Sequence, residues 1–399
     1  MTTHRFTDFD APHFWSLVAL GAAVVLAGLA AAHVMETQGH VVTGMDNQVV
    51  WGLPHVFAIF LIVAASGVLN VASIGTVFGR SIYKTRAPLS GLLSLALLAG
   101  GLMVLMLDLG RPDRIDVAAT HYNFRSVFAW NVFLYSGLAA LVIVYLWTMM
   151  ERRMKPFARP VGLVAFAWRI VLTTGTGSIF AFLVARQAYA TAVLAPLFIV
   201  LSFVWGLAVF LIVQAALNAW NAIELHPAIV KRTRDLLGLF IVAALYLAAT
   251  YHLTNLYFAR QGAFERFILV DGGLYTALLW IGYVGVGSLL PLWLVWGPGG
   301  GSARSVLLGS ALVVAGGFAF LYAFIIGGQV FPLEIFPGFE VHSTFADGQI
   351  GHYAPSLWEA LLGAGGLALA FLITIAGVRA FDFLPRDDTR ELDAAMGRQ

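Results

Sequence analysis

Ten long apolar runs, separated by short polar or Gly/Pro-containing stretches, constrain the fold of this chain more than any other feature. A helix needs about 20 mostly apolar residues to cross a hydrocarbon core of about 30 Å. Because 60% of the 399 residues are hydrophobic, we expect an all-α polytopic bundle that forms a single integral membrane domain over residues 1–399. The runs predict membrane helices over residues 14–35, 54–78, 88–107, 127–150, 161–185, 192–219, 236–258, 272–296, 304–328 and 356–380.

The charges between the runs predict the orientation of the bundle. Loops rich in Lys and Arg are retained on the cytoplasmic side of a membrane. With the N-terminus inside, sixteen of the 23 Lys and Arg residues fall on the cytoplasmic face and six on the outer face, while Arg169 lies inside the fifth run. We therefore expect both termini to be cytoplasmic.

The composition also limits the chemistry of this chain. The absence of cysteine removes iron–sulfur clusters, thiolate metal sites and covalently attached haem. His33, His55 and His252 lie near the ends of runs, so a buried histidine pair for haem is not expected, and we predict no metal site. A net charge of +2 without any Lys/Arg-rich run argues against nucleic acid as a partner.

The segment Asp108–Arg114, between the third and fourth runs, departs from the charge pattern. Three of the six outer arginines lie in this segment or shortly after it. Arginines that oppose the topology bias are expected to have local carboxylate partners, which Asp108, Asp113 and Asp116 supply. We expect a structured outer loop here.

Polar residues gather at the outer ends of the first five runs. A quinone needs hydrogen-bonding groups at its two carbonyl oxygens, an apolar slot and a proton-exchanging group, and histidine suits the last role. His55 is the strongest candidate, since Trp51-Gly-Leu-Pro54 sets a helix start just before it. The alternative is that these residues are interfacial anchors, with Asp108 and Arg111 capping the third helix. The candidate quinone-binding residues are His33, His55, Asp108, Arg111, Asn131, Arg186 and Tyr189.

Three further residues are candidates for a proton path. Arg169 lies about two turns into the fifth helix, where it either snorkels to the cytoplasm or lines a path from that side. Glu359 lies one turn into the tenth helix, where the helix dipole alone explains a carboxylate and proton exchange is the alternative. His252 lies at the outer end of the seventh helix.

Several segments together resemble the NrfD/polysulfide reductase membrane-subunit family. They are Trp51-Gly-Leu-Pro54 before a Gly/Ala-rich helix, Asp108-Leu-Gly-Arg-Pro-Asp-Arg114 and Phe128-Ala-Trp-Asn131. The ten runs and Tyr353-Ala-Pro-Ser-Leu-Trp-Glu359 resemble the longer branch of that family, which includes hydrogenase membrane subunits and the alternative complex III. Within this branch the chain looks most like the DsrP-type subunit of the membrane complex associated with dissimilatory sulfite reductase.

The resemblance implies a multi-pass subunit of the bacterial cytoplasmic (inner) membrane that binds a quinone or quinol, either menaquinone or ubiquinone. Such a subunit is not catalytic alone; it belongs to a quinone-dependent oxidoreductase complex of respiration or sulfur metabolism. The resemblance implies electron exchange with a periplasmic, ferredoxin-like iron–sulfur subunit and further redox subunits, with proton movement as a possible coupled process. In the family the quinone lies among the early helices, and the matching residues here are His55, Asp108 and Arg111.

Two other functions compete with this one. The first is a secondary transporter of an anion or small acid, with the outer arginines as its entry site. Such transporters often have helices broken near the middle of the membrane, whereas Pro196 and Pro291 lie near the ends of their runs. The second is a purely structural anchor whose partner holds the quinone.

Overall fold

The computed structural model describes residues 14–220, 226–298, 300–333, 348–381 and 383, and this part of the chain is helical without any strand. Ten of its helical segments are long and apolar enough to cross a membrane, which confirms the expected all-α bundle. Both chain termini lie outside the described residues. The ten spans are Phe14–Gln38, Leu53–Val77, Ile82–Leu107, Val127–Met150, Arg152–Ala181, Leu194–Trp220, Pro227–Tyr257, Leu274–Trp296, Ala303–Val330 and Leu357–Ala380.

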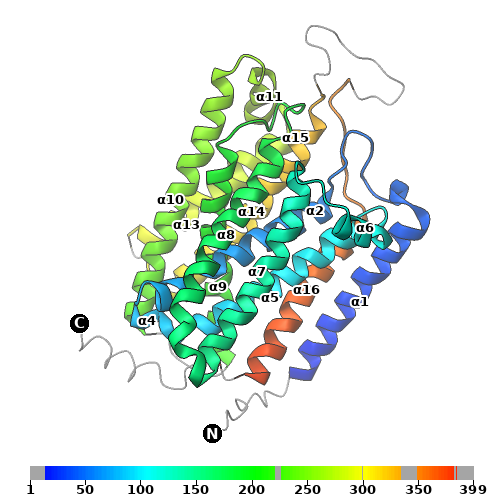
Figure 1. Ribbon diagram of the computed structural model, residues 1–399. Coiled ribbons are helices and arrows are strands. Elements are labelled where there is room, and N and C mark those ends of the chain that lie inside the picture. The colour runs from blue at the N-terminus through cyan, green and yellow to red at the C-terminus, as the bar shows by residue number, and fades with distance from the viewer. Residues whose placement is uncertain (1–13, 221–225, 299, 334–347, 382, 384–399) are drawn as a thin grey trace.

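The main helices run side by side, nearly parallel to one another (Figure 1). They are α1 (Phe14–Gln38), α2 (Leu53–Val68), α5 (Ala87–Leu107), α7 (Val127–Met150), α8 (Ala158–Ala181), α9 (Leu194–Trp220), α10 (Pro227–Tyr257), α13 (Leu290–Trp296), α14 (Ala303–Leu321) and α16 (Leu357–Ala380). Short helices lie between or extend them: α3 (Asn70–Ala72), α4 (Ser81–Lys84), α6 (Ile115–Thr120), α11 (Gly262–Arg266), α12 (Leu274–Ala277) and α15 (Gly327–Val330).

The two ends of the bundle are distinct. At one end the Arg379 guanidinium, near the end of α16, lies 4.3 Å from the ring centroid of Phe14 at the start of α1. We call this the Phe14 end. The opposite end, where α1 finishes and α6, α11 and α15 lie (Figure 1), is called the Asp108 end.

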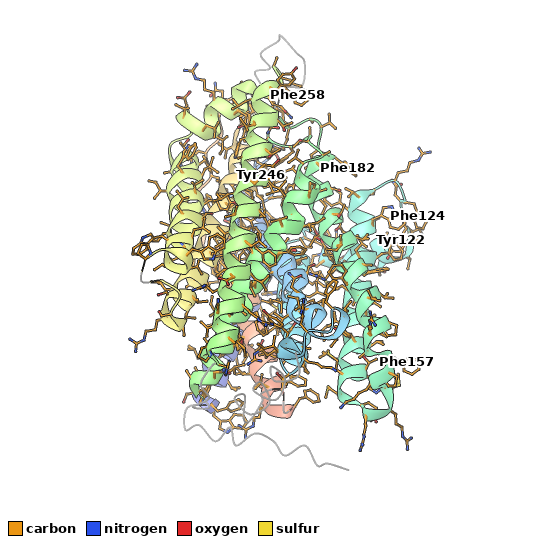
Figure 2. The ribbon with its side chains drawn as sticks, turned by 90° about the vertical axis from the view of Figure 1, so that its left-hand side faces the viewer. Tyr122, Phe124, Phe157, Phe182, Tyr246 and Phe258 are labelled. Atoms are coloured by element: carbon orange, nitrogen blue, oxygen red, sulfur yellow. The ribbon has the colours of Figure 1, made fainter. Side chains whose placement is uncertain are left out.

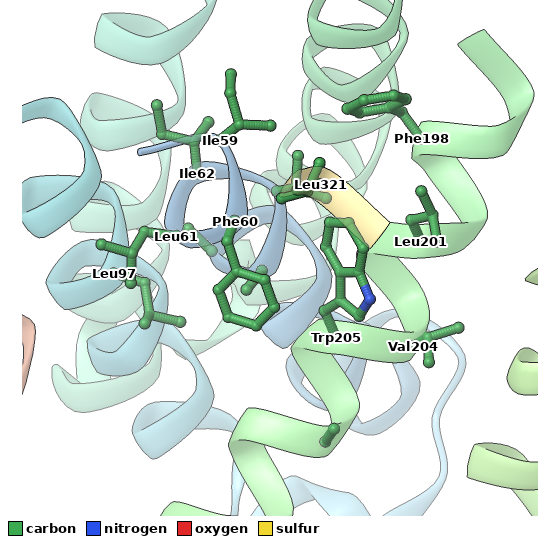
Figure 3. Close-up of a cluster of buried hydrophobic side chains, with 14 of the residues drawn as sticks. Ile59, Phe60, Leu61, Ile62, Leu97, Phe198, Leu201, Val204, Trp205 and Leu321 are labelled. Atoms are coloured by element: carbon green, nitrogen blue, oxygen red, sulfur yellow. The ribbon is translucent and has the colours of Figure 1, made fainter. Parts of the chain in front are cut away.

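Helix α2 forms the centre of the bundle. In the most apolar stretch of the span Leu53–Val77, which begins with α2, 89% of the residues are buried, against 22% in α1 at the periphery. A helix that is apolar on all sides is expected to be surrounded by other helices. Figure 3 shows Phe60 of α2 facing Trp205 of α9, and their rings stack with centroids 5.2 Å apart.

Small residues let the central helices touch through their backbones. A Cβ on Gly67 of α2 would overlap the carbonyl group of Ser202 in α9, and a Cβ on Gly28 of α1 would lie 2.9 Å from the Cα of Gly365 in α16. In lipid, where no hydrophobic force drives helices together, such close approach supplies van der Waals contact.

Aromatic side chains project from the outside of the bundle (Figure 2). Phe182 and Phe258 lie toward the Asp108 end and Phe157 toward the Phe14 end; their exposed fractions are 66%, 53% and 54%. Such large apolar groups belong to a surface that faces lipid rather than water.

Two features of the helices depart from what hydropathy predicts. Helix α10 begins at Pro227 rather than near residue 236, because its first turns are polar and start from a cap in which His226 Nδ1 accepts from Ala228 N. In addition, π-helical segments interrupt the membrane spans at Ser73–Val77, Leu278–Leu289 and Tyr322–Ile326. Such segments commonly mark functional positions in helices.

Candidate functional site

A buried histidine–carboxylate pair lies at the Asp108 end, between the start of α2 and the end of α5. Gly52 precedes α2 and Pro54 occupies its first turn, which places His55 in that turn. Asp108 caps the C-terminus of α5. His55 Nδ1 lies 2.7 Å from Asp108 Oδ2, and the Asp108 side chain is 1% exposed. At this distance the two atoms form an ion pair when His55 is protonated, although their geometry is not that of a hydrogen bond.

A second histidine approaches the same carboxylate from the loop after α1. His40 Nε2 donates to the backbone oxygen of Asp108 at 3.1 Å and lies 4.0 Å from its Oδ1. Neither Asp108 carboxylate oxygen accepts a conventional hydrogen bond from the described protein atoms. Among the described residues, the charged or titratable groups within 4.0 Å of this carboxylate are the two histidines, His40 and His55. Sequence reasoning missed His40; its only signal was a further histidine between the first two runs, close to the run that carries His55.

An apolar cavity of about 450 Å³ lies beside His55, walled by α2, α5, α7 and α8. This volume is within the range of about 300–1,000 Å³ usual for small-molecule sites. Asn131 lines it and its Oδ1 is buried without a hydrogen-bond partner among the described atoms. The lining residues are Trp51, His55, Ile59, Leu102, Leu105, Met106, Leu109, Ile115, Phe128, Asn131, Val132, Tyr135, Ser136, Ile179, Phe180 and Ile325.

A second, more polar pocket of about 460 Å³ also borders on His55. Its walls include His40, Asp46, Asn47 and Asp108. The two cavities share Trp51, His55 and Leu109, so the imidazole borders on both.

The Trp51 indole forms part of the wall between the two cavities. It stacks on His55 with ring centroids 5.9 Å apart and meets the edges of Phe128 and Phe180 at 6.3 and 5.6 Å. The imidazole is therefore held by an aromatic contact on one face and by Asp108 at Nδ1.

Two of the candidates chosen from sequence lie away from both cavities. His33 is exposed on α1. Arg111 is also exposed and donates through Nε and Nη2 to the two carboxylate oxygens of Asp113, at 2.9 and 2.8 Å. These hydrogen bonds hold the pKa of Asp113 below its usual value. The local carboxylate partner expected for Arg111 is thus Asp113.

Arg186 and Tyr189 lie behind the cavity wall rather than on it. Arg186 donates to the backbone oxygens of Gln48 and Gln329 at 2.7 and 3.0 Å, and burial lowers its pKa. The Tyr189 hydroxyl donates to the backbone oxygen of Ile325 at 2.9 Å, and burial raises its pKa. Both residues therefore tie the second half of the chain to the region around the cavity.

Arg169 points into the bundle instead of snorkelling to its surface. The side chain is fully buried, Nη2 donates to Asn70 Oδ1 at 2.6 Å, and Nη1 donates to the Ser66 backbone oxygen at 3.2 Å. Its guanidinium also lies 4.7 Å from the ring centroid of Phe166. The snorkelling interpretation is wrong, and Ser66 of α2 and Asn70 of α3 supply the polar partners that an intramembrane arginine needs.

Glu359 is fully engaged in a helix cap. Its Oε1 accepts from the Tyr353 hydroxyl at 2.6 Å, while Oε2 accepts from the backbone nitrogens of Gly44 and Ser356 at 2.9 and 2.7 Å. Ser356 Oγ accepts from Glu359 N in return, which completes a capping box. These contacts explain the carboxylate without proton exchange.

His252 belongs to a second histidine–carboxylate pair at the Asp108 end. Its Nδ1 lies 2.8 Å from Glu265 Oε2, and Asn255 Nδ2 donates to Glu265 Oε1 at 2.8 Å. The side chains of His252 and Glu265 are 15% and 0% exposed, close to the 15% and 1% of His55 and Asp108. Only about 10 Å³ of space adjoins His252, roughly enough for one water molecule.

Fold and site together define a multi-pass membrane protein with a histidine–carboxylate pair between an apolar cavity and a polar pocket at one end of its bundle. Residues 41–333 match the model of the family described as polysulphide reductase, NrfD, and the chain belongs to this family. The matched region contains the second to ninth spans, while α1 and α16 outside it pack against each other.

Three curated relatives are similar over nearly the whole chain. An Archaeoglobus fulgidus protein named Hdr-like menaquinol oxidoreductase integral membrane subunit is 28% identical over 96% of this chain and 97% of its own. A Halobacterium salinarum protein, named as a membrane subunit of dimethyl sulfoxide reductase, is 26% identical over 90% of this chain and 89% of its own. A selenate reductase subunit of Mesobacillus selenatarsenatis is 22% identical over 90% of this chain and 92% of its own.

Proposed function

We propose that this chain is the quinol-interacting membrane subunit of an oxidoreductase complex, and that its quinone site is the apolar cavity beside His55. The observation that carries the proposal is the position of His55, which borders on an apolar cavity and a polar pocket and pairs with buried Asp108. The name of the Archaeoglobus relative supports menaquinol as the first quinol to test.

The cavity suits a quinone head group and the start of its tail. Apolar side chains make up most of its wall, as an aromatic ring and a prenyl chain require. His55 and the unpartnered Oδ1 of Asn131 are the polar groups available to hydroxyl or carbonyl oxygens. A bound quinol supplies two electrons and two protons.

His55 and Asp108 provide a proton acceptor at the cavity wall. With Nδ1–H directed at Asp108, the Nε2 lone pair of His55 accepts a proton, and the carboxylate stabilises the resulting imidazolium. Asp108 also faces His40, which lines the polar pocket. The proton then leaves through Asp108 toward the polar pocket, which Asp108 and His40 both line.

Electrons pass to a partner subunit in this proposal, since the chain has no cysteine to ligate an iron–sulfur cluster. The partner is a ferredoxin-like iron–sulfur subunit docked on the Asp108 end. The loop charges support an outward, periplasmic orientation of this end in a bacterial cytoplasmic membrane. The exposed Arg111–Asp113 pair lies on the surface available for docking.

Substitution of His55 in the assembled complex tests the proposal. Since a positioned acid–base group contributes about 10²–10⁴-fold, His55→Ala is expected to lower quinol oxidation by at least about a hundredfold. His33→Ala, at an exposed histidine of the same end, is the matched control and leaves turnover unchanged. Normal turnover and normal affinity for a quinol-site inhibitor in His55→Ala would contradict the site assignment.

We further propose that proton coupling, where the complex has it, involves the His252–Glu265 pair. The pair repeats the geometry of His55–Asp108 without a cavity large enough for a quinone, which favours a proton as its ligand. Glu265→Gln is expected to lower the number of protons released per quinol oxidised by complexes in liposomes. The quinol KM should stay unchanged; an unchanged proton ratio would refute the role.

Two of the outer arginines do not have the free guanidinium groups that an anion transporter would need at its entry site. Arg111 pairs with Asp113, and Arg186 donates to two backbone carbonyl oxygens. Neither arginine lines either of the two cavities, so neither supports an anion entry site there.

A further inference from the structure

The segment that carries Trp51 is fixed by a side chain from the other half of the molecule. Trp51 lies in the loop before α2, so no hydrogen bonds within a helix fix its backbone. The restraint comes from Gln329 in α15, which is fully buried. Its Oε1 accepts from the backbone nitrogens of Val50 and Trp51 at 3.0 Å each, and its Nε2 donates to the Trp51 oxygen at 2.9 Å.

The same amide also contacts the backbone of a second residue that lines the apolar cavity. Gln329 Nε2 donates to the backbone oxygen of Ile325 at 2.9 Å, and Ile325 lines the cavity together with Trp51. Gln329 thereby makes four hydrogen bonds, which saturate both donors and both acceptor positions of its amide. Trp51 cannot shift relative to Ile325 without breaking some of these bonds.

Two neighbours complete the contact. Arg186 links the Gln329 and Gln48 backbone oxygens, and Gln48 Nε2 donates to the Val330 oxygen at 2.7 Å. We call Gln48, Arg186 and Gln329 the Trp51 clamp. The bonds of Gln329 to Val50 and Trp51 and of Gln48 to Val330 join the loop before α2 to α15, and Arg186 bonds to both sides. The wall between the two cavities is therefore in contact with the second half of the chain.

We propose that Gln329 is a positioning residue of the quinol site, which holds Trp51 against His55 and thereby separates the apolar cavity from the polar pocket. The inference rests on the proposed function. Gln329 lines neither the apolar cavity nor the polar pocket; it acts through Trp51, which stacks on the imidazole. Misplacement of a reacting group by about 1 Å costs on the order of a hundredfold in rate.

The test compares Gln329→Leu with Gln214→Leu in the assembled complex. Gln214 of α9 is equally a buried glutamine, 2% exposed, and lies outside both cavities of the site. Quinol kcat/KM is expected to fall at least about tenfold in Gln329→Leu and to stay near wild type in Gln214→Leu. If Gln329→Leu does not assemble, Arg186→Lys replaces it in the test. Lysine keeps the positive charge but lacks the two guanidinium nitrogens that donate to the Gln48 and Gln329 oxygens, so kcat/KM is expected to fall by less than in Gln329→Leu.

A double-mutant cycle separates positioning from general destabilisation. In a Trp51→Ala background the side chain to be positioned is gone, so Gln329→Leu should cost far less than in wild type. Equal losses in both backgrounds, or a Gln329→Leu enzyme that behaves like Gln214→Leu while His55→Ala is inactive, would overturn the inference alone. A His55→Ala complex with normal turnover would overturn the proposed function beneath it.

Discussion

Replacement of Asp108 with asparagine perturbs the His55 site with little change of shape. Asp108 is buried and its Oδ2 lies 2.7 Å from His55 Nδ1. An asparagine with its nitrogen toward His55 donates to Nδ1, which moves the imidazole proton to Nε2 and removes the Nε2 lone pair. With its oxygen toward His55 it preserves the tautomer but loses the charge that stabilises the imidazolium.

The two orientations give different magnitudes. A hydrogen bond to a charged group contributes about 1.5–3 kcal/mol, and about 1.4 kcal/mol of barrier corresponds to tenfold in rate. Loss of the charge alone is therefore expected to lower kcat by about ten- to a hundredfold. Inversion of the tautomer removes the proton acceptor itself and is expected to cost about 10²–10⁴-fold.

The assay is quinol oxidation by the assembled complex, with kcat and KM measured separately and inhibitor affinity as a measure of site integrity. Asp113→Asn is the matched control, because this exposed aspartate belongs to the same loop and pairs only with Arg111 among its described ion pairs. A kcat of Asp108→Asn within about twofold of wild type, with normal inhibitor binding, would refute the proton-acceptor reasoning.

Two predictions concern the fold around the site. Gly67→Val places a side chain against the backbone of Ser202, so α2 and α9 must separate. We expect a large loss of thermal stability, measured by unfolding in detergent. Gly262→Ala, at a position with open space, should lose little stability. Glu359→Gln removes one carboxylate oxygen from a buried cap and is expected to cost about 1–3 kcal/mol of stability without a change in protons per quinol. A changed proton ratio at unaltered stability would instead favour a proton path through Glu359.

The architecture could be predicted from the sequence because lipid leaves few choices. Every backbone amide in the hydrocarbon must be bonded within its own segment, so an apolar run of sufficient length is a helix. The polar start of α10 could not be predicted in this way, because Lys231, Arg232 and Arg234 are charged and do not belong to an apolar run. The π-helical segments could not be foreseen either, because they depend on packing between helices.

The candidate site could be predicted only in part. The motif before His55 and the position of Asp108 at a helix end were sufficient to select both residues. Location near a membrane surface does not say which way a side chain points, and His33 and Arg111 consequently point elsewhere. Gln329 gave no signal at all, because its partners are about 280 positions away and its role exists only in three dimensions.

The helix termini around the pair act on both of its members. Helices α2 and α5 pack against each other in opposite directions, so the N-terminus of α2 lies beside the C-terminus of α5. The positive end of the α2 dipole favours the carboxylate of Asp108 but opposes a cation at His55 in its own first turn, and the negative end of the α5 dipole favours that cation but opposes the carboxylate at its own C-cap, by about 0.3–1 kcal/mol each. The dipole effects on the ion pair therefore largely cancel, and the direct contact with Asp108 is what stabilises a protonated His55. The dipoles of both helices remain in Asp108→Asn, and their opposed effects cannot replace the carboxylate.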